Sequence, residues 1–566
     1  MVLILLSWLY LFLTSIILGI GFSKLFRIQS LTVVFAGILG LFGITLLASS
    51  WAIFGRINIE FHAFLIITSI TLGFYLKSDL KDITQSILTQ LNSFSLALKA
   101  LFSISSILIL LQSATLPFIV DNETYYIQTI KWLNEYGFVP GLANLHLFLG
   151  QTSGWHITQS VYSFSFLYDS FNDLNGYLFL LFNYWAFQKL HSYFTNANRL
   201  DLVFGLLPLT YVFLFQFISA PSPDLPVYLI SFIVLSMYLE IHKDNVLEKF
   251  NLITIFVLFA IYIKITALVL LAFPLLLFIK HIAVVRSQLI PFRFLGGLVL
   301  FLFVIKNIML TGYPFYPLTV FPNSNADYLV PMEIMDFFFS RDMMHSFYIP
   351  FSVFENATFF ILVKQYFLHS GIDSIIGLAT VFLLLISPFI ISKYYPKQRI
   401  RDVYFVFVLA LILLVFSSPQ YRFFVYFTIF FGLVFLSVMF TNKKIILGLL
   451  SFSLLAIGVL LFVPMSFSAL TQNKLLAKNS TFQLENVIHP KPNTRDNLNY
   501  IKITKGNLDY YSPTETPIFW ISGNGHLPCA NKEQLDYFET NFNVIPQLRG
   551  KTLKEGFYAK KLKTND

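Results

Sequence analysis

Long apolar runs alternate with short polar segments along most of this chain. A helix that crosses a bilayer needs about 20 consecutive apolar residues, within a range of about 17–25. The repetition of such runs predicts an all-α polytopic transmembrane helical bundle of about 14 spans. The neighbouring runs between residues 250 and 281 leave one long tilted helix open as an alternative. The runs lie near residues 2–21, 31–53, 61–76, 96–118, 175–195, 202–218, 225–241, 250–263, 266–281, 293–309, 372–392, 403–417, 423–440 and 445–465.

Composition supports a membrane protein and limits its chemistry. Hydrophobic residues make up 56% of the 566 residues and charged residues only 12%, whereas soluble domains carry roughly a quarter charged residues. The single cysteine, Cys529, excludes an internal disulfide framework and a cysteine zinc site. The sequence contains no phosphate-binding loop, dinucleotide fingerprint or serine-hydrolase elbow.

The basic residues between the runs predict the orientation of the bundle. Lys and Arg of membrane proteins gather in cytoplasmic loops, so the net charge of +9 does not indicate a nucleic-acid partner. The apolar start lacks a small-residue cleavage site and predicts a retained span rather than a signal peptide. Placing the N-terminus outside predicts a multi-pass protein of the plasma (inner) membrane with an extracytoplasmic C-terminus. The loops that then lie inside carry Lys24, Arg27, Lys77, Lys81, Lys189, Arg199, Lys243, Lys249, Lys280, Arg286, Arg293, Lys393, Lys397, Arg399, Arg401, Lys443 and Lys444.

Three stretches on the predicted outer side are long: residues 119–174, 310–371 and 466–566. The first contains the amphipathic segments TYYIQTIKWLNEYG and WHITQSVYSFSFLYDSF, which are expected to lie on the membrane surface with the apolar face down. The last is polar, and its PIFWISGNG segment predicts a short strand entering a turn. It is interpreted as a small extracytoplasmic domain or cap.

Two acids, Asp121 and Glu123, follow the apolar run that ends near residue 118. One interpretation is that Asp121 N-caps a surface helix starting at Asn122, since Asp is a favoured N-cap. The other is a general base that takes a proton from an acceptor hydroxyl at the outer membrane surface. Residues at i and i+2 do not share a helix face, so the two acids are expected to divide roles, although a metal pair stays open.

Asp224 and Lys264 also stand at predicted outer ends of spans. Asp224 in ISAPSPDLP fits an N-cap with Pro226 in the first turn, or a hydrogen-bond partner for hydroxyls of a polar substrate. Lys264 interrupts an apolar stretch, where a lysine costs about 2.5–3.5 kcal/mol on insertion scales. It either snorkels from a tight hairpin or, where two half-length helices meet, contacts a phosphate or carboxylate.

Further candidates lie in three other outer segments. Lys306, Tyr313 and Tyr316 fit either an interfacial aromatic belt with a snorkelling lysine or the wall of a binding site stiffened by prolines. Arg422 in VFSSPQYRFFVYF is either an interface anchor or a phosphate ligand, because a guanidinium donates two parallel hydrogen bonds. The histidines of the first outer loop are additional substrate-binding candidates, without the spacing of a zinc site; they are His146 and His156.

Most of these residues map to one face of the membrane under a topology derived largely from other residues. Acids and several cations at one lipid boundary indicate a site that activates a hydroxyl and accepts a phosphate. The residues concerned are Asp121, Asp224, Lys264, Lys306, Tyr313 and Arg422.

The pattern resembles the GT-C superfamily of integral membrane glycosyltransferases, and most of all an uncharacterised bacterial branch. The resemblance covers roughly residues 95–440, which makes residues 1–94 an addition, 95–465 a GT-C-like core and 466–566 a C-terminal cap. It rests on the segments VDNETYYIQTIKWLNEYG, PSPDLP, YIKITAL, TGYPFYP and SSPQYRFF.

The resemblance implies transfer of a sugar from a polyprenyl-phosphate carrier to a lipid, glycan or protein acceptor at the outer leaflet. Asp121 would be the base, with Glu123 as the second candidate, and Lys264, Arg422 and Lys306 would bind the carrier phosphate. No second metal-binding acid motif is found, so no cofactor is expected, and a divalent metal stays open. A single base without a carboxylate nucleophile favours inversion of the anomeric carbon.

Three other functions compete with this one. A polysaccharide polymerase or ligase also uses lipid-linked glycans and would require Arg422 but not Asp121. A transporter or flippase is expected to carry charges near the membrane midplane in matching halves, whereas these charges gather at one surface. A structural subunit of an envelope complex would need none of the named charges.

Overall fold

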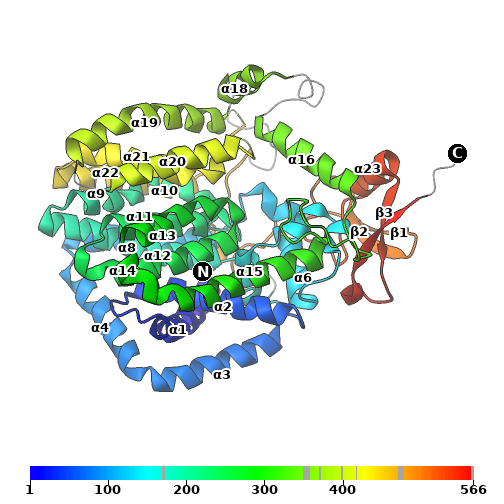
Figure 1. Ribbon diagram of the computed structural model, residues 1–566, viewed down its shortest axis with the longest axis horizontal. Coiled ribbons are helices and arrows are strands. Elements are labelled where there is room, and N and C mark those ends of the chain that lie inside the picture. Colours follow the sequence, from blue (N-terminus) through cyan, green and yellow to red (C-terminus); the bar gives the residue numbers. More distant parts are fainter. Residues whose placement is uncertain are drawn as a thin grey trace.

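The computed structural model describes residues 1–168, 172–347, 357–368, 371–396, 399–415, 417–468, 477–495 and 498–562. Lys397 and parts of the three long outer stretches lie outside these residues. Helices make up most of the described chain and form a bundle, and a smaller region with strands adjoins one end of it (Figure 1).

Each of the fourteen apolar runs coincides with a helix or with consecutive helical segments. Eight helices among the described residues are long and apolar enough to cross a membrane, or nine if the bent pair of α3 and α4 is one span. The helices of the runs are α1 (Val2–Leu25), α2 (Val33–Ala52), α3 (Ile59–Tyr75), α5 (Leu96–Ser113), α8 (Leu174–Asn196), α9 (Arg199–Gly205) with α10 (Tyr211–Leu214), α11 (Asp224–Leu239), α12 (Val246–Ile263), α13 (Ala272–Lys280), α15 (Leu289–Thr311), α19 (Ile372–Tyr394), α20 (Ile400–Val415), α21 (Val425–Met439) and α22 (Lys443–Phe462).

The stretch between residues 250 and 281 is two helical pieces. α12 ends at Ile263 because Lys264 adopts an extended backbone, with φ −152° and ψ 123°. A 3-10 segment, Ile265–Leu271, and then α13 return in the other direction. The single long helix is therefore wrong: two helical segments meet at Lys264, although α12 with the turn before it is long enough to cross a membrane and is not half-length.

The first two helices pack unusually closely, and glycine explains how. A Cβ atom on Gly19 would lie 1.8 Å from the carbonyl oxygen of Ala36, and one on Gly40 would lie 1.7 Å from that of Ser15. Small residues allow such backbone contact between membrane helices. One apolar cluster contains residues from Ile4 to Leu461, on both sides of residues 94 and 95, so the division of the chain at this point stays a prediction.

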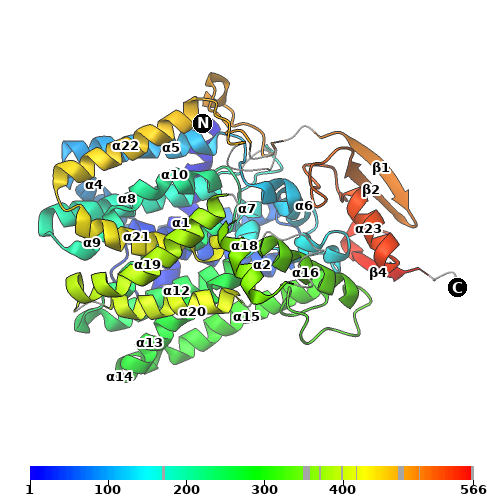
Figure 2. The same ribbon diagram turned by 90° about the horizontal axis from the view of Figure 1, so that it is seen from above.

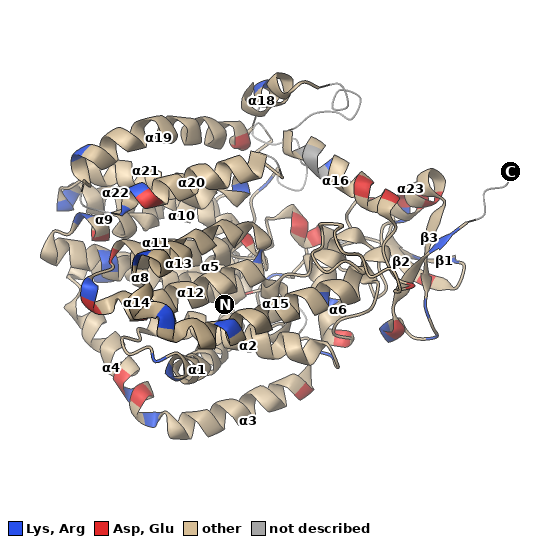
Figure 3. Ribbon diagram, in the orientation of Figure 1, with Lys and Arg blue, Asp and Glu red and all other residues tan. Residues whose placement is uncertain are grey.

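The two ends of the bundle differ in charge. Many Lys and Arg residues gather at the end where α4 (Lys77–Ser93), α9 and α14 (Ile282–Val285) lie, away from the strands (Figure 3). The opposite end carries α6 (Ile127–Glu135), α7 (Gly154–Val161), α16 (Met332–Phe347) and the C-terminal region (Figure 2). The first end corresponds to the loops that the sequence predicts to be cytoplasmic.

The first outer stretch does not lie flat on a membrane surface. Residues 122–134 are buried with the single exception of half-buried Lys131, and all of α7 is buried. The reason is that α6 is covered on its polar side, where Gln128 donates to the carbonyl oxygens of Gly523 and Gly525, each at 3.0 Å. The predicted surface helices are therefore wrong: the polar face of α6 binds the C-terminal region, and α7 packs against α2, where the hydroxyls of Thr158 and Thr45 bond at 2.6 Å.

The C-terminal region contains two small antiparallel sheets and one helix. β1 (Tyr500–Lys505) pairs with β2 (Leu508–Pro513), and β3 (Val544–Leu548) pairs with β4 (Phe557–Lys561). The helix, α23 (Lys532–Phe542), lies between the two strand pairs in the sequence. The PIFWISGNG segment forms bends and a turn, so the predicted strand is wrong. Its backbone hydrogen bonds go to the first outer stretch: the amides of Ser522 and Gly523 donate to the Glu123 carbonyl at 3.2 and 2.8 Å.

Candidate functional site

Asp121 and Arg422 form an ion pair although 301 residues separate them in the chain. The Arg422 Nη1 donates to Asp121 Oδ2 at 2.7 Å, and the two side chains keep 32% and 26% of their surface exposed. Arg422 Nε donates to Gln420 Oε1 at 2.6 Å, and the Tyr228 hydroxyl donates to the Arg422 carbonyl at 2.6 Å. These bonds fix the turn between α20 and α21 so that the guanidinium meets the first outer stretch.

Asp121 precedes a π-helical turn, Asn122–Tyr126, as the sequence predicts for a helix start at this point. Its side chain makes no capping hydrogen bond. Instead, Oδ2 also accepts a long hydrogen bond of 3.4 Å from the Tyr126 hydroxyl. The N-cap interpretation of Asp121 is therefore wrong, because the carboxylate is used on Arg422. Wide π-helical turns occur often at functional sites.

Lys264 and Asp224 form a second ion pair beside the first. Lys264 Nζ donates to Asp224 Oδ1, and it also lies 4.5 Å from the ring centre of Phe423. Asp224 is the first residue of α11 and makes no capping hydrogen bond, so its N-cap interpretation is wrong as well. Its side chain is only 3% exposed, whereas that of Lys264 is 19% exposed. The lysine is thus the more exposed member of this ion pair, and the aspartate is its buried partner.

The two pairs act on each other electrostatically. Burial alone would raise the pKa of the Asp121 carboxyl, but the charge and hydrogen bond of Arg422, followed by the charge of Lys264, lower it below its usual value. Asp121 is therefore ionised at neutral pH. We call Asp121, Asp224, Lys264 and Arg422 the Arg422 cluster; its formal charges cancel.

A third predicted cation, Lys306, lies on the buried side of this cluster. It is 4% exposed, and its Nζ donates to the Thr152 carbonyl. The neighbouring His156 accepts from the Ser153 amide at 3.3 Å through Nδ1, and its buried Nε2 has no hydrogen-bond partner in the described chain. Burial, and then the charge of Lys306, lower the pKa of His156 to about 3, so the ring is neutral at physiological pH.

The charges of Lys306, Asp121 and Lys264 all act on the His156 ring. Its centre is 4.7 Å from that of Tyr126, whose hydroxyl reaches Asp121. The structure therefore brings six predicted site residues together. They are Asp121, His156, Asp224, Lys264, Lys306 and Arg422.

Glu123 points to a different partner. Its carboxylate accepts from Thr494 Oγ1 at 2.7 Å and from the Arg495 amide at 2.9 Å, and it is 2% exposed. Asn122 Nδ2 donates to the same carboxylate at 3.0 Å. Glu123 therefore holds the C-terminal segment onto the first outer stretch, beside the residue that meets Arg422.

The remaining predicted residues are bonded to backbone away from the cluster. Tyr313 and Tyr316 donate to the carbonyls of Val330 and Leu147 at 2.9 and 2.8 Å. His146 Nε2 bonds the Trp520 carbonyl at 2.9 Å. All three side chains are buried, and they connect the outer segments to one another.

Sequence reasoning missed Tyr126 and Gln420, which contact the two exposed members of the cluster. Gln420 stands two residues before Arg422 and Tyr126 five after Asp121, so spacing was the available signal. Among the described residues, no three His, Cys, Asp or Glu side chains are placed to hold a metal ion.

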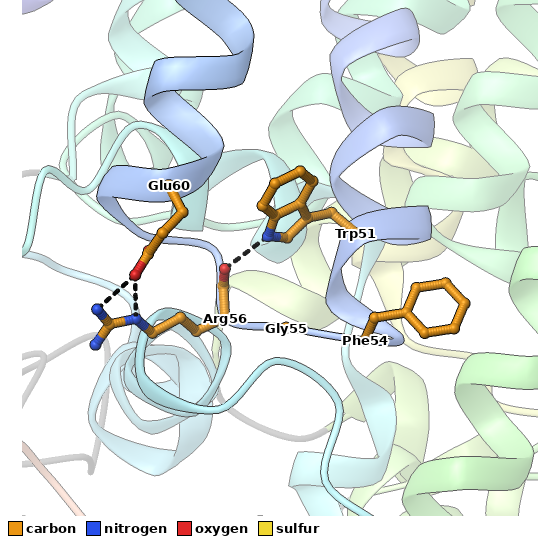
Figure 4. A pocket seen from close by; sticks show the side chains of 5 residues that line it. All are labelled: Trp51, Phe54, Gly55, Arg56 and Glu60. Atoms are coloured by element: carbon orange, nitrogen blue, oxygen red, sulfur yellow. Dashed lines mark hydrogen bonds and ion pairs between the residues drawn. The ribbon is translucent and has the colours of Figure 1, made fainter.

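Two pockets lie elsewhere on the surface. One, of about 460 Å³, is lined by Trp51, Phe54, Gly55, Arg56 and Glu60 at the turn between α2 and α3 (Figure 4). The other has a volume of about 400 Å³ and lies against the C-terminal segment. Its lining residues are Leu116, Glu485, Asn486, His489, Pro490, Lys491, Pro492, Thr494 and Arg495.

Comparison with known proteins gives a family but no activity. No curated protein and no solved structure matches the chain. Residues 1–429, well over half of the 566 residues, match a family described as "Domain of unknown function (DUF8201)". The match includes α1–α3 and all members of the Arg422 cluster and stops before the C-terminal region. The chain belongs to the DUF8201 family.

Proposed function

We propose that this protein is an integral membrane glycosyltransferase that moves a sugar from a polyprenyl-phosphate carrier to a lipid, glycan or protein acceptor. The observation that carries the proposal is the ion pair between Asp121 and Arg422, with Lys264 beside it. These residues combine a proton acceptor with two cations, and each keeps part of its surface exposed. Such a set suits a reaction in which a hydroxyl loses a proton while a lipid phosphate leaves.

The architecture supports an outer-leaflet reaction. The helices that coincide with the fourteen apolar runs, read as alternating spans of a GT-C-like bundle, bring the Arg422 cluster and the C-terminal region to one side. The basic loops come to the other side, which the positive-inside rule makes cytoplasmic. Carriers with long polyprenyl chains stay in the bilayer, so a site at its boundary meets their phosphate.

The ion pair suggests how donor binding prepares the base. In the resting protein Arg422 neutralises Asp121, which keeps the carboxylate ionised but weakly basic. A donor phosphate offers Arg422 a geometry that accepts two parallel hydrogen bonds. As the guanidinium turns to the phosphate, Asp121 loses its strongest partner and its proton affinity rises. The base becomes effective when the donor is in place.

The transfer step exchanges one bond of the anomeric carbon for another. Asp121 takes the proton of the acceptor hydroxyl, and the acceptor oxygen bonds to the anomeric carbon from the face opposite the phosphate. The bond between that carbon and the phosphate oxygen breaks, and its electron pair stays on the lipid phosphate. Arg422 and Lys264 stabilise this charge, and preorganised stabilisation of that kind is often the largest catalytic contribution. The protonated carboxyl returns its proton to water.

The test compares envelope glycans of cells with and without the gene, and then attempts rescue with variants. Asp121→Asn is expected to reduce transfer by about 10²–10⁴-fold, the usual contribution of a general base, while the protein remains inserted. Asp201→Asn is the matched control, because Asp201 pairs with Lys189 at the other end of the bundle. Glycans restored to normal by Asp121→Asn would remove the base; loss with Arg422 variants alone would favour a polymerase or ligase.

A further inference from the structure

The pocket of about 400 Å³ lies where the C-terminal segment crosses the start of the first outer stretch. Its lining combines the carbon atoms of Leu116 and two prolines with several charged and polar side chains. This volume is within the usual range of small-molecule sites, about 300–1,000 Å³.

Cations outnumber acids in this lining. The lining has two cations, Lys491 and Arg495, and one acid, Glu485. No carboxylate in the described chain pairs with Lys491, whose ammonium therefore remains available. The pocket of Figure 4 offers a contrast, because Arg56 Nη2 there lies 2.7 Å from Glu60 Oε1 and is already neutralised. Of these two pockets, only the C-terminal one contains a cation, Lys491, that has no carboxylate partner in the described chain and can bind an anion.

Backbone bonds hold the walls of the pocket in place. The Lys491 amide donates to the Ala114 carbonyl at 2.9 Å, and the Leu116 amide donates to Ser480 Oγ at 2.8 Å. Thr494 is fixed by Glu123 at 2.7 Å. Lys491 thus serves the fold through its backbone, while its side chain lines the pocket. Replacing that side chain tests ligand binding without removing a structural bond.

The pocket adjoins the segment that carries the proposed base. Leu116 lines it and Glu123 clamps its wall, and Asp121 lies between these two residues and turns toward Arg422. One short segment therefore contacts the Arg422 cluster and the C-terminal pocket. A second substrate anchored in the pocket would approach Asp121 from a side other than that of Arg422.

We propose that this pocket binds an anionic group of the acceptor substrate. The inference rests on the proposed function, because it names the second reactant of the same site. A phosphate and a carboxylate share the required chemistry: both accept charge-assisted hydrogen bonds from ammonium and guanidinium groups. The anion is therefore either the phosphate of a lipid-linked acceptor or the carboxylate of an acidic glycan.

Direct binding measurements test the proposal without depending on catalysis. The full chain is placed in nanodiscs of phosphatidylcholine, whose headgroup carries no net charge, and is titrated calorimetrically with glycerol 3-phosphate and with glucuronate. We expect Lys491→Gln to weaken binding of one probe about tenfold or more, as for loss of a charged hydrogen bond, and Lys491→Arg to restore most of it. Arg56→Gln is the matched control and is expected to leave the affinity unchanged.

The outcomes separate the two anions and the two sites. Lys491-dependent binding of glycerol 3-phosphate identifies a phosphate acceptor, and that of glucuronate an acidic glycan. The titrations are repeated in Arg422→Gln, which removes phosphate binding at the donor site and is expected to leave the Lys491-dependent binding in place. Absence of binding by both probes, or binding that Lys491→Gln does not change, overturns the pocket. Normal glycans with Asp121→Asn would remove Asp121 as the base of the proposed function and leave Lys491-dependent anion binding in place.

Discussion

Two clusters of charged side chains, one near each end of α11, differ in how completely their hydrogen bonds are used. Lys189, Asp201, Glu240 and Lys249 form what we call the Lys189 cluster, joined by ion pairs. Asp224 of the Arg422 cluster begins α11 and Glu240 follows its end, so the two clusters are about 24 Å apart along that helix. Both contain two acids and two cations.

The carboxylate oxygens of the Lys189 cluster already have partners within the protein. Asp201 accepts from Lys189 through one oxygen and from Ser192 and Asn198 through the other, at 2.8 and 3.2 Å. The side chains of its ion pairs are 9–22% exposed. Buried ion pairs of this kind fix geometry more than they add stability.

The Arg422 cluster has unused capacity. Only one oxygen of Asp121 accepts hydrogen bonds, and Arg422 Nη2 donates none within the described chain. These two side chains are also the more exposed ones, at 26% and 32%. A charged cluster is therefore a candidate site when its side chains are partly exposed and some of their hydrogen-bond donors and acceptors are unused. These groups can then bind a substrate.

The largest effect is expected from removing a cation. Lys264→Met leaves Asp224 buried without its partner, which costs about 3–5 kcal/mol. The double variant Lys264→Met/Asp224→Leu is expected to recover most of this stability but not the transfer activity. Thermal unfolding in detergent, together with transfer per amount of folded protein, measures both.

Lys189→Met is the matching variant in the Lys189 cluster. It is expected to lower the free energy of unfolding by a similar amount while leaving transfer per folded protein unchanged. If transfer recovers in the Lys264/Asp224 double variant, these two residues have only a structural role, like the Lys189 cluster.

Changing the shape of a cation without its charge is expected to have a smaller effect. Arg422→Lys keeps the charge opposite Asp121 but loses the planar fork, because a lysine cannot donate two parallel hydrogen bonds. The apparent affinity for the lipid-phosphate donor is expected to fall about tenfold. Donor titrations measure it, with Arg56→Lys as control; an unchanged donor dependence contradicts phosphate binding by Arg422.

The next smaller effect is expected in the pH dependence of transfer, which should differ between variants of the two clusters. Arg422 lowers the pKa of Asp121, so the pair stabilises the fold above the usual aspartate value of about 3.9, and this contribution is lost as the pH falls through the lowered pKa. The acid limb of kcat/KM is expected to move to higher pH in Arg422→Gln. Lys189→Gln should leave that limb in place. A limb that stays fixed in Arg422→Gln would mean that another group is the base.

The smallest effect concerns topology alone. A cysteine replacing Phe54, which is 85% exposed, is expected to react with an impermeant reagent from outside, whereas Lys444→Cys is expected to be protected. The native Cys529 is buried and gives little background. Residues 221–224 are buried and would be poor reporters even on the outer side. The reverse labelling pattern would invert the orientation of both clusters.

The apolar runs predict the helices because hydrophobic length is a local property of the sequence. The break at Lys264 was predictable for the same reason, since a charge inside an apolar stretch must reach a polar partner. Likewise, the common location of Asp121 and Arg422 followed from counting spans. Their direct contact could not be predicted, because no local pattern specifies which of several outer loops meet.

The errors have one physical cause. Local rules gave Asp121 and Asp224 capping roles and put residues 124–137 on a membrane surface. In the folded chain the carboxylates bond distant cations instead, and the C-terminal region covers α6. The polar groups of a charged or amphipathic segment form hydrogen bonds and ion pairs with the partners that the tertiary structure places beside them. The neighbouring sequence does not specify those partners.

The bonds to Glu123 have a consequence for biosynthesis. The stretch bearing Asp121 is secured by Thr494, Arg495, Ser522 and Gly523, which leave the ribosome some 370 to 400 residues later. A chain still being made has the helices of all the apolar runs, the last of them α22, before it has the residues that bond Glu123. The stretch that bears Asp121 would therefore reach its final structure only after the C-terminal segment has been made and has bound to it.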